Sequence, residues 1–350
     1  MGRTNSTDFP VANALQSTAG ETTGPIDGFA TKLSSSGSSL VYSTYLGASQ
    51  SDTAYGIAVD AGGNAYITGS FRGKRPEGEP QHLTKTLTPD PISPLTGGYF
   101  GAAVIKLTSS GGLVYGTILG SGVGIDITVD NNGRAYVVGS TSGLPKIPVT
   151  GFQTAYAGEA DVFFAVLNSS GDQLDGGTFL GGASNDYGEA IALGVQGAVY
   201  IAGHTHSADF PTSNAFQSEH NSAPDYTDAF VAKIVGDGAS SEYSTFLGGS
   251  SGNEFVGGLA YANGQAYLAG TVDGFDFPTR NPLDTGGNLD DGLGRSSAMR
   301  RWQSPTRCRC RRIGAAARRR CITPMSRGIR ARGISGLQWP ISQFRHLGRG

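Results

Sequence analysis

Short segments with alternating apolar and polar residues recur along this chain, separated by glycine-rich turns. One type of segment is present four times, at 54–70, 124–140, 187–205 and 255–271. A side-chain period of two is typical of β-strands, so each segment predicts two short strands joined by a tight turn. No segment has the 3.6-residue apolar stripe of an amphipathic helix.

Two further types of segment fill the intervals between these pairs of strands. The first type is found at 29–33, 100–107, 163–167 and 230–234, and the second at 40–47, 113–120, 176–182 and 242–249. Loops of the type DFPTSNAFQ, at 209–217, return at 8–16 and 276–284. Each period therefore predicts four antiparallel strands, which is the blade unit of a β-propeller. The predicted fold class is all-β, a propeller of four-stranded blades.

The repeats amount to about four blade-equivalents. Complete blades are predicted at 56–120, 124–181 and 188–248, with unpaired outer strands at 29–46 and inner strands at 257–270. Two arrangements stay open at this point. The two halves could combine into one composite blade and close a small four-bladed ring, or the chain could form an incomplete arc of a larger propeller.

A tyrosine recurs at the same place in the second strand of each pair. These residues are Tyr66, Tyr136, Tyr200 and Tyr267. An aliphatic residue follows each of them, and the residue before is alanine in three cases and Val199 in the fourth. We expect the four rings to be equivalent and largely buried between neighbouring blades.

The motifs together resemble one known family. The stretches DFPTSNAFQ (209–217), DAFVAKI (228–234), YSTYLG (42–47) and GIAVDAGGNAYITG (56–69) are similar to the seven-bladed β-propeller repeat family, SBBP. The resemblance covers residues 8 to about 290. It implies a propeller from a bacterial secreted or surface-associated protein, without shared catalytic residues, whose partner would be a protein or a carbohydrate. The chain departs from the family in having too few repeats for seven blades.

Charge divides the chain near Asp291. The 28 acidic residues all lie in 1–291, together with 11 of the 26 Lys and Arg residues, whereas 292–350 holds 15 Arg and no acid. This predicts a repeat domain at 1–291 and a separate Arg-rich tail at 292–350, for which we expect no tertiary role.

Three explanations of the tail stay open. It could be a translated frameshift, a disordered basic arm or a zinc site that uses Cys308, Cys310 and Cys321. The spacing of these cysteines is poor for structural zinc. Despite the basic charge, we do not expect nucleic acid as a partner.

Other regions add little to the functional picture. Residues 71–98 replace the usual loop by a longer Pro-rich and charged insertion, which we expect to be a tolerated surface excursion. The chain has no signal peptide at its start and no apolar run of about 18–20 residues that would span a membrane. An extracellular or cell-surface location is therefore expected from the resemblance alone.

Three acidic residues stand at matching places before the inner strands. Asp52, Asp186 and Glu254 could together bind a cation such as Ca²⁺ near the propeller axis, or serve in acid–base chemistry. The simpler interpretation is that each carboxylate caps a turn. No other cofactor is expected.

Four more residues lie in loops on the same predicted face. They are His204, His206, Asp209 and Asp276. The two histidines are two residues apart on an extended segment and so point the same way, but no third metal ligand accompanies them.

No catalytic motif is present, so no catalytic residue is predicted. Three hypotheses follow. The first is a non-enzymatic scaffold or recognition module. The second is a metal-dependent hydrolase or lyase that uses the axial carboxylates. The third is a non-functional gene fragment.

Overall fold

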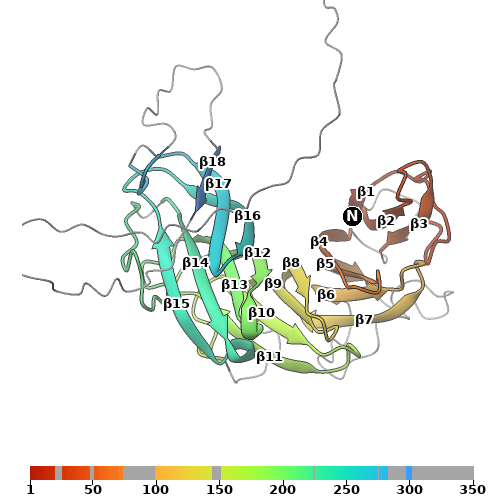
Figure 1. Ribbon diagram of the computed structural model, residues 1–350, viewed down its shortest axis with the longest axis horizontal. Coiled ribbons are helices and arrows are strands. Elements are labelled where there is room, and N and C mark those ends of the chain that lie inside the picture. The colour runs from red at the N-terminus through yellow and green to blue at the C-terminus, as the bar shows by residue number, and fades with distance from the viewer. Residues whose placement is uncertain are drawn as a thin grey trace, which may run out of the picture. The chain divides into compact units, whose positions relative to one another are not determined.

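The computed structural model describes residues 1–19, 26–47, 51–73, 99–143, 151–223, 225–274, 276–282 and 297–301. These residues form five antiparallel sheets that follow one another in chain order (Figure 1). The all-β fold of four-stranded blades is confirmed. Among the described residues, helical geometry is confined to two short 3₁₀ turns, η2 (Val195–Gly197) and η3 (Gly236–Gly238).

The three central sheets each have four strands. The second sheet contains β4 (Thr53–Val59), β5 (Ala65–Gly73), β6 (Tyr99–Leu107) and β7 (Leu113–Gly120). The third contains β8 (Val123–Val129), β9 (Ala135–Thr141), β10 (Asp161–Leu167) and β11 (Leu174–Leu180). The fourth contains β12 (Asp186–Leu193), β13 (Val199–Thr205), β14 (Asp228–Val235) and β15 (Ser240–Leu247). In each sheet, strands that are consecutive in the chain are neighbours.

The first and fifth sheets each have three strands. The first contains β1 (Gly2–Thr4), β2 (Asp27–Leu33) and β3 (Leu40–Leu46). The fifth contains β16 (Glu254–Ala262), β17 (Gln265–Val272) and β18 (Ser297–Arg301). The composite blade considered from the sequence is therefore not formed in this chain, because β2 pairs with β1 and β17 pairs with β18.

One strand, β18, comes from the tail, for which we expect no tertiary role. It belongs to the Arg-rich segment, yet its backbone pairs with β17 from Thr271↔Ser297 to Tyr267↔Arg301. Backbone hydrogen bonds depend little on side-chain identity, and an edge strand presents open N–H and C=O groups to any segment within reach. The predicted boundary at Asp291, the three cysteines and residues 74–98 of the insertion predicted at 71–98 lie outside the described residues.

A separate apolar core joins each sheet to the next. Ile67 and Ile105 of the second sheet pack with Ala30 of the first, and the second and third sheets meet around Val104 and Phe163. Further cores join the third sheet to the fourth and the fourth to the fifth. No such core among the described residues joins the fifth sheet to the first.

The recurring tyrosines lie in these cores, with one exception. Tyr66, Tyr136 and Tyr200 are 0%, 0% and 3% exposed, and each packs towards the sheet that follows it. Tyr267, in contrast, is only half-buried. The four tyrosines occupy equivalent places in the strand pairs, as predicted. Tyr267 is less buried than the other three, because no further sheet follows the fifth within the described residues.

Candidate functional site: paired carboxylates at the sheet junctions

The loops that connect successive sheets are held by side chains of the repeated motif. In the third sheet, the amide of Gln153 donates to Thr178 Oγ1 at 3.1 Å, and that hydroxyl donates back to the Gln153 carbonyl at 3.1 Å. The Gly181 amide then donates to Gln153 Oε1 at 3.1 Å. The same bonds recur around Gln16 with Thr44 and Gly47, and around Gln217 with Thr245 and Gly248. These motif residues therefore fix backbone.

In three sheets, the glycine that follows the outermost strand makes room for a carboxylate. A Cβ at Gly181 would lie 2.5 Å from Asp161 Cγ, and one at Gly248 would lie 2.3 Å from Asp228 Cγ. Gly47 stands against Asp27 in the same way. A side chain at these positions would displace the acid, which is why the fourth strand ends in glycine.

The aspartates of the DFP loops are loop anchors. Asp209 Oδ1 accepts a hydrogen bond from the Ala183 amide at 2.9 Å, and Asp276 Oδ2 accepts one from the Ser250 amide at 2.8 Å. Hydrogen bonds from Ser250 hold the pKa of Asp276 below its usual range. Asp209 and Asp276 were predicted as candidates on the ligand face. Each ties together two loops of its sheet, the one before the first strand and the one after the second strand.

Each acid that precedes an inner strand is placed beside a second acid. The Asp186 amide donates to the Ala160 carbonyl at 2.6 Å, which brings Asp186 next to Asp161. The Glu254 amide donates to the Thr227 carbonyl at 3.0 Å, next to Asp228. The amide of Asp52 makes the same bond to the Ile26 carbonyl at 2.6 Å, next to Asp27. We call these three places the acid-pair junctions.

All six carboxylates are buried, with exposures between 0% and 1%. Asp52, Asp186 and Glu254 were predicted from the sequence, whereas their partners Asp27, Asp161 and Asp228 were not. The sequence does contain a signal for the partners. Each stands two residues before a phenylalanine, in the strand next to the outermost strand of its sheet: Asp27-Gly-Phe, Asp161-Val-Phe and Asp228-Ala-Phe.

Burial and mutual repulsion disfavour ionisation at two of these junctions. Burial raises the pKa of Asp161, and it raises that of Asp186 to about 6, with Asp161 as a further cause. Burial followed by the charge of Asp228 raises the pKa of Glu254 to about 8. These shifts follow the ordinary rule that desolvation and like charge favour the neutral acid.

The second and third sheets meet without an acid pair. Gly101 takes the place of the third-strand acid, and Gly122 that of the inner-strand acid. A Cβ at Gly101 would lie 2.2 Å from the Gly120 carbonyl oxygen of the neighbouring strand β7, so there is no room for a side chain at this position. Both acids are absent together, as expected if they act as a pair.

The structure keeps the predicted metal candidates apart. Asp52, Asp186 and Glu254 lie at three different sheet junctions. Among the described residues, no three His, Cys, Asp or Glu side chains are grouped so that they could hold a metal ion.

The two histidines have different surroundings. His204 Nδ1 lies 3.1 Å from Glu189 Oε1, and the ring stacks on Tyr187 with a centroid distance of 4.9 Å. The His206 amide donates to the Asn185 carbonyl at 3.0 Å, and burial lowers the pKa of the His206 ring. Both are thus engaged with the loop and inner strand of the fourth sheet.

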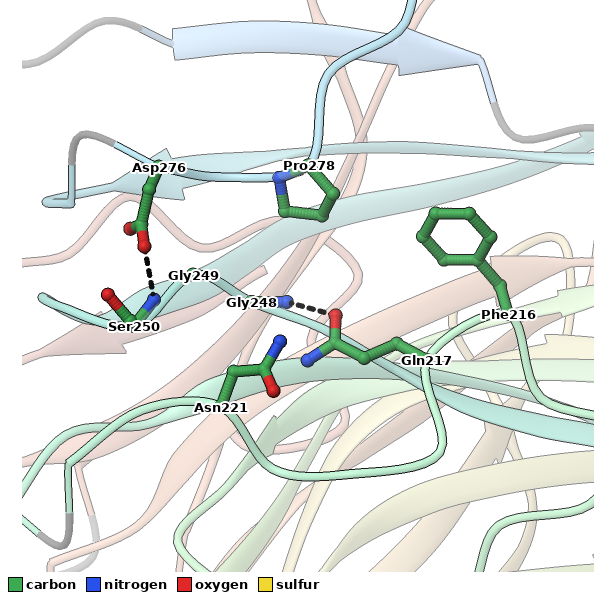
Figure 2. Close-up of a pocket in the computed structure, with 8 residues that line it drawn as sticks. All are labelled: Phe216, Gln217, Asn221, Gly248, Gly249, Ser250, Asp276 and Pro278. Carbon is green, nitrogen blue, oxygen red and sulfur yellow. Dashed lines mark hydrogen bonds between the residues drawn. The ribbon is translucent and has the colours of Figure 1, made fainter.

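A pocket of about 310 Å³ opens at the junction of the fourth and fifth sheets. Figure 2 shows Asp276 and Ser250 on one side and Gln217, which is bonded to Gly248, on the other, with the Phe216 ring at the rim. Asn221, Gly249 and Pro278 complete the lining. The pocket lies directly against the acid pair, because Gln217 Nε2 and the Asn221 amide donate to Asp228 Oδ2 at 3.0 and 3.1 Å.

Residues 41–70 match the family described as a beta-propeller repeat, SBBP. The matched stretch runs from β3 through β4 into β5, so it crosses from the first sheet to the second. It contains Asp52, and it includes the connecting loop with its terminal Gly47. The repeat resemblance drawn from the motifs is therefore confirmed.

Two solved structures are similar to this chain at low identity. One is a protein of unknown function from Dyadobacter fermentans, with 12% identity, a TM-score of 0.35 and coverage of 67% of this chain and 60% of that one. The other is the GH43 endo-arabinanase from Bacillus licheniformis, with 13% identity, a TM-score of 0.30 and coverage of 62% and 64%. This chain spans less than two thirds of either structure. No curated protein matches it.

Proposed function

We propose that this chain is a non-enzymatic β-propeller repeat module that acts as a scaffold or recognition domain of a bacterial secreted or surface protein. One observation carries the proposal. The polar residues of the repeated motif bind backbone or one another within the loops, as Gln153 and Asp209 do, so the repeat specifies architecture. Recognition is then left to positions that differ from sheet to sheet.

The pocket beside the last acid pair offers such a position. Phe216 is 62% exposed at its rim, next to the amide side chains of Gln217 and Asn221. An apolar ring face beside amide and carboxylate groups suits a carbohydrate, since sugars stack on aromatic rings and bond to polar groups at their edges. No described helix has the length and apolar character to cross a membrane. We further propose that the module is displayed outside the cell.

Binding and turnover can be separated with the full chain and a panel of bacterial and plant polysaccharides. Retention of one polysaccharide without release of reducing ends, and weaker retention by Phe216→Ala at unchanged Tm, is the expected result. The matched control is Val195→Ala, because Val195 is 63% exposed but lies at the opposite end of β13. Release of reducing ends that stops in EDTA would overturn the proposal in favour of a metal-dependent hydrolase or lyase.

The proposed location needs its own measurement. An antibody against the repeat domain should label intact producing cells. Signal only after the cells are lysed would contradict display at the surface.

A further inference from the structure

The last acid-pair junction has more negative charge and fewer hydrogen-bond donors than the one before it. At the junction of the third and fourth sheets, Asp186 Oδ2 accepts hydrogen bonds from the Gly182 amide and from Ser207 Oγ, both at 2.8 Å. The Thr205 hydroxyl also lowers the pKa of Asp186 by hydrogen bonding. These donors stabilise the Asp186 carboxylate.

The fifth sheet lacks the corresponding hydroxyl groups. Aligning the second strands at Gly203 and Gly270 places Val272 where the fourth sheet has Thr205, and Gly274 where it has Ser207. Asp273 stands in the place of His206. Compared with the fourth sheet, the fifth therefore lacks two hydroxyl donors and has one additional acid.

Glu254 shows the consequence. Its side chain is 1% exposed, and no side-chain donor reaches Oε1 or Oε2 within the described part of the chain. The Gly249 backbone amide is the one hydrogen-bond donor that acts to lower its pKa. Asp228, Asp276 and Asp273 all act to raise its pKa, after burial. None of these four acids takes part in an ion pair among the described residues. A buried carboxylate with a single backbone donor and three acids nearby is costly and calls for a compensating group.

We propose that the junction of the fourth and fifth sheets binds one divalent cation, Ca²⁺ by preference, between Glu254 and Asp228. Ser222 Oγ donates both to Asp228 Oδ1 and, at 3.4 Å, to the Gly249 carbonyl, so these two oxygens are neighbours. Two carboxylates and a carbonyl oxygen are ligands that Ca²⁺ prefers, and water from the pocket supplies the others. The adjoining pocket gives the ion its way in.

The site belongs to this junction and not to the repeat as a whole. At the preceding junction, Asp186 Oδ2 already accepts from an amide and a hydroxyl group, and Asp161 accepts from the amides of Ala157 and Gly158 at 2.9 and 3.1 Å. At the last junction, Asp228 likewise has several donors, but Glu254 has no hydroxyl donor within the described residues. The ion would therefore strengthen the link between the fourth and fifth sheets. It is a structural ion, and no catalytic step is involved.

Thermal unfolding of the full chain at pH 8, stripped with EDTA and then titrated with Ca²⁺, tests the site. Addition of about 1 mM Ca²⁺ is expected to raise the Tm of the wild type by about 3 °C through mass action. Glu254→Gln should remove this rise, and the matched variant Asp186→Asn should keep it. An unchanged wild-type Tm, or a Glu254→Gln variant that still responds, would overturn the proposal.

Direct binding does not depend on either variant folding well. Tb³⁺ luminescence, or calorimetry with Ca²⁺, on the wild-type chain should report one ion per chain. The expected Kd lies at about 10⁻⁴–10⁻³ M, because only two carboxylates contribute. Absence of binding up to about 10 mM, beyond that range, would overturn the proposal even if no variant can be prepared.

Discussion

The junction of the third and fourth sheets and that of the fourth and fifth sheets share one backbone design but treat their acids differently. In both, the amide of the inner-strand acid bonds to the carbonyl just before the third-strand acid. Asp186 then receives a backbone amide and a hydroxyl group, whereas Glu254 has the Gly249 backbone amide but no hydroxyl donor within the described residues. The comparison teaches that a repeat can preserve the position of a carboxylate while changing what neutralises it.

The largest expected effect concerns the packing of one sheet on the next. Tyr136→Ala should lower the free energy of unfolding by about 3–5 kcal/mol, as for other fully buried aromatic residues. Tyr267→Ala should cost less, because the Tyr267 ring is partly exposed whereas Tyr136 is fully buried. Urea denaturation of the two variants measures the difference. Equal losses would show that the fifth sheet is covered as fully as the third.

The glycine that faces an acid gives the next largest effect. Gly181→Ala should destabilise the protein by about 1–3 kcal/mol, because its Cβ would lie 2.5 Å from Asp161 Cγ. Gly258→Ala is the control, since no heavy atom lies within 4 Å of its Cβ position. Chemical denaturation should show almost no change for the control. Similar stability of both variants would mean that the acid is free to move aside.

The donor groups themselves can be removed from the junction that has them. Ser207→Ala should cost about 1–2 kcal/mol at pH 8, because a hydrogen bond to a buried carboxylate is lost. It should also raise the pKa of Asp186 above its value of about 6. NMR titration of the Asp186 carboxyl carbon checks the shift. A lowered pKa would show that Ser207 does not stabilise the ionised form.

The pH dependence of the free energy of unfolding gives the smallest expected change, counted per pH unit. The folded-state pKa of Glu254, about 8, exceeds its ordinary value of 4.5, so the folded state holds a proton that the unfolded state has lost. In EDTA, stability should therefore fall between pH 4.5 and about 8, by at most about 1.4 kcal/mol per pH unit. For Asp186 the same sign applies between 3.8 and about 6.

Two variants separate these windows. Glu254→Gln should flatten the upper part of the stability curve, above pH 6, and Asp186→Asn should affect only the lower part. Tm measured across pH values in EDTA is sufficient. A wild-type curve that rises through the upper window would contradict the raised pKa of Glu254.

The strands, their grouping in fours and the resemblance to the repeat family could all be predicted from the sequence. Alternating side chains and glycine turns act within a few residues, and four copies of one pattern make the signal plain. The Gly and Gln positions of the loop motifs were visible in the same way, although their bonding partners were not.

Only the tertiary structure decided which residues meet. Asp161 and Asp186 come from strands of two different sheets, and their proximity depends on how those sheets pack. Tyr267 is only partly buried because no further sheet follows the fifth within the described residues. The pairing of β18 with β17 likewise depends on which segment lies beside the free edge of β17. Burial and like charge act through space, between residues that are distant in the sequence. They raise the pKa of Glu254, and the residues next to Glu254 in the chain do not reveal this.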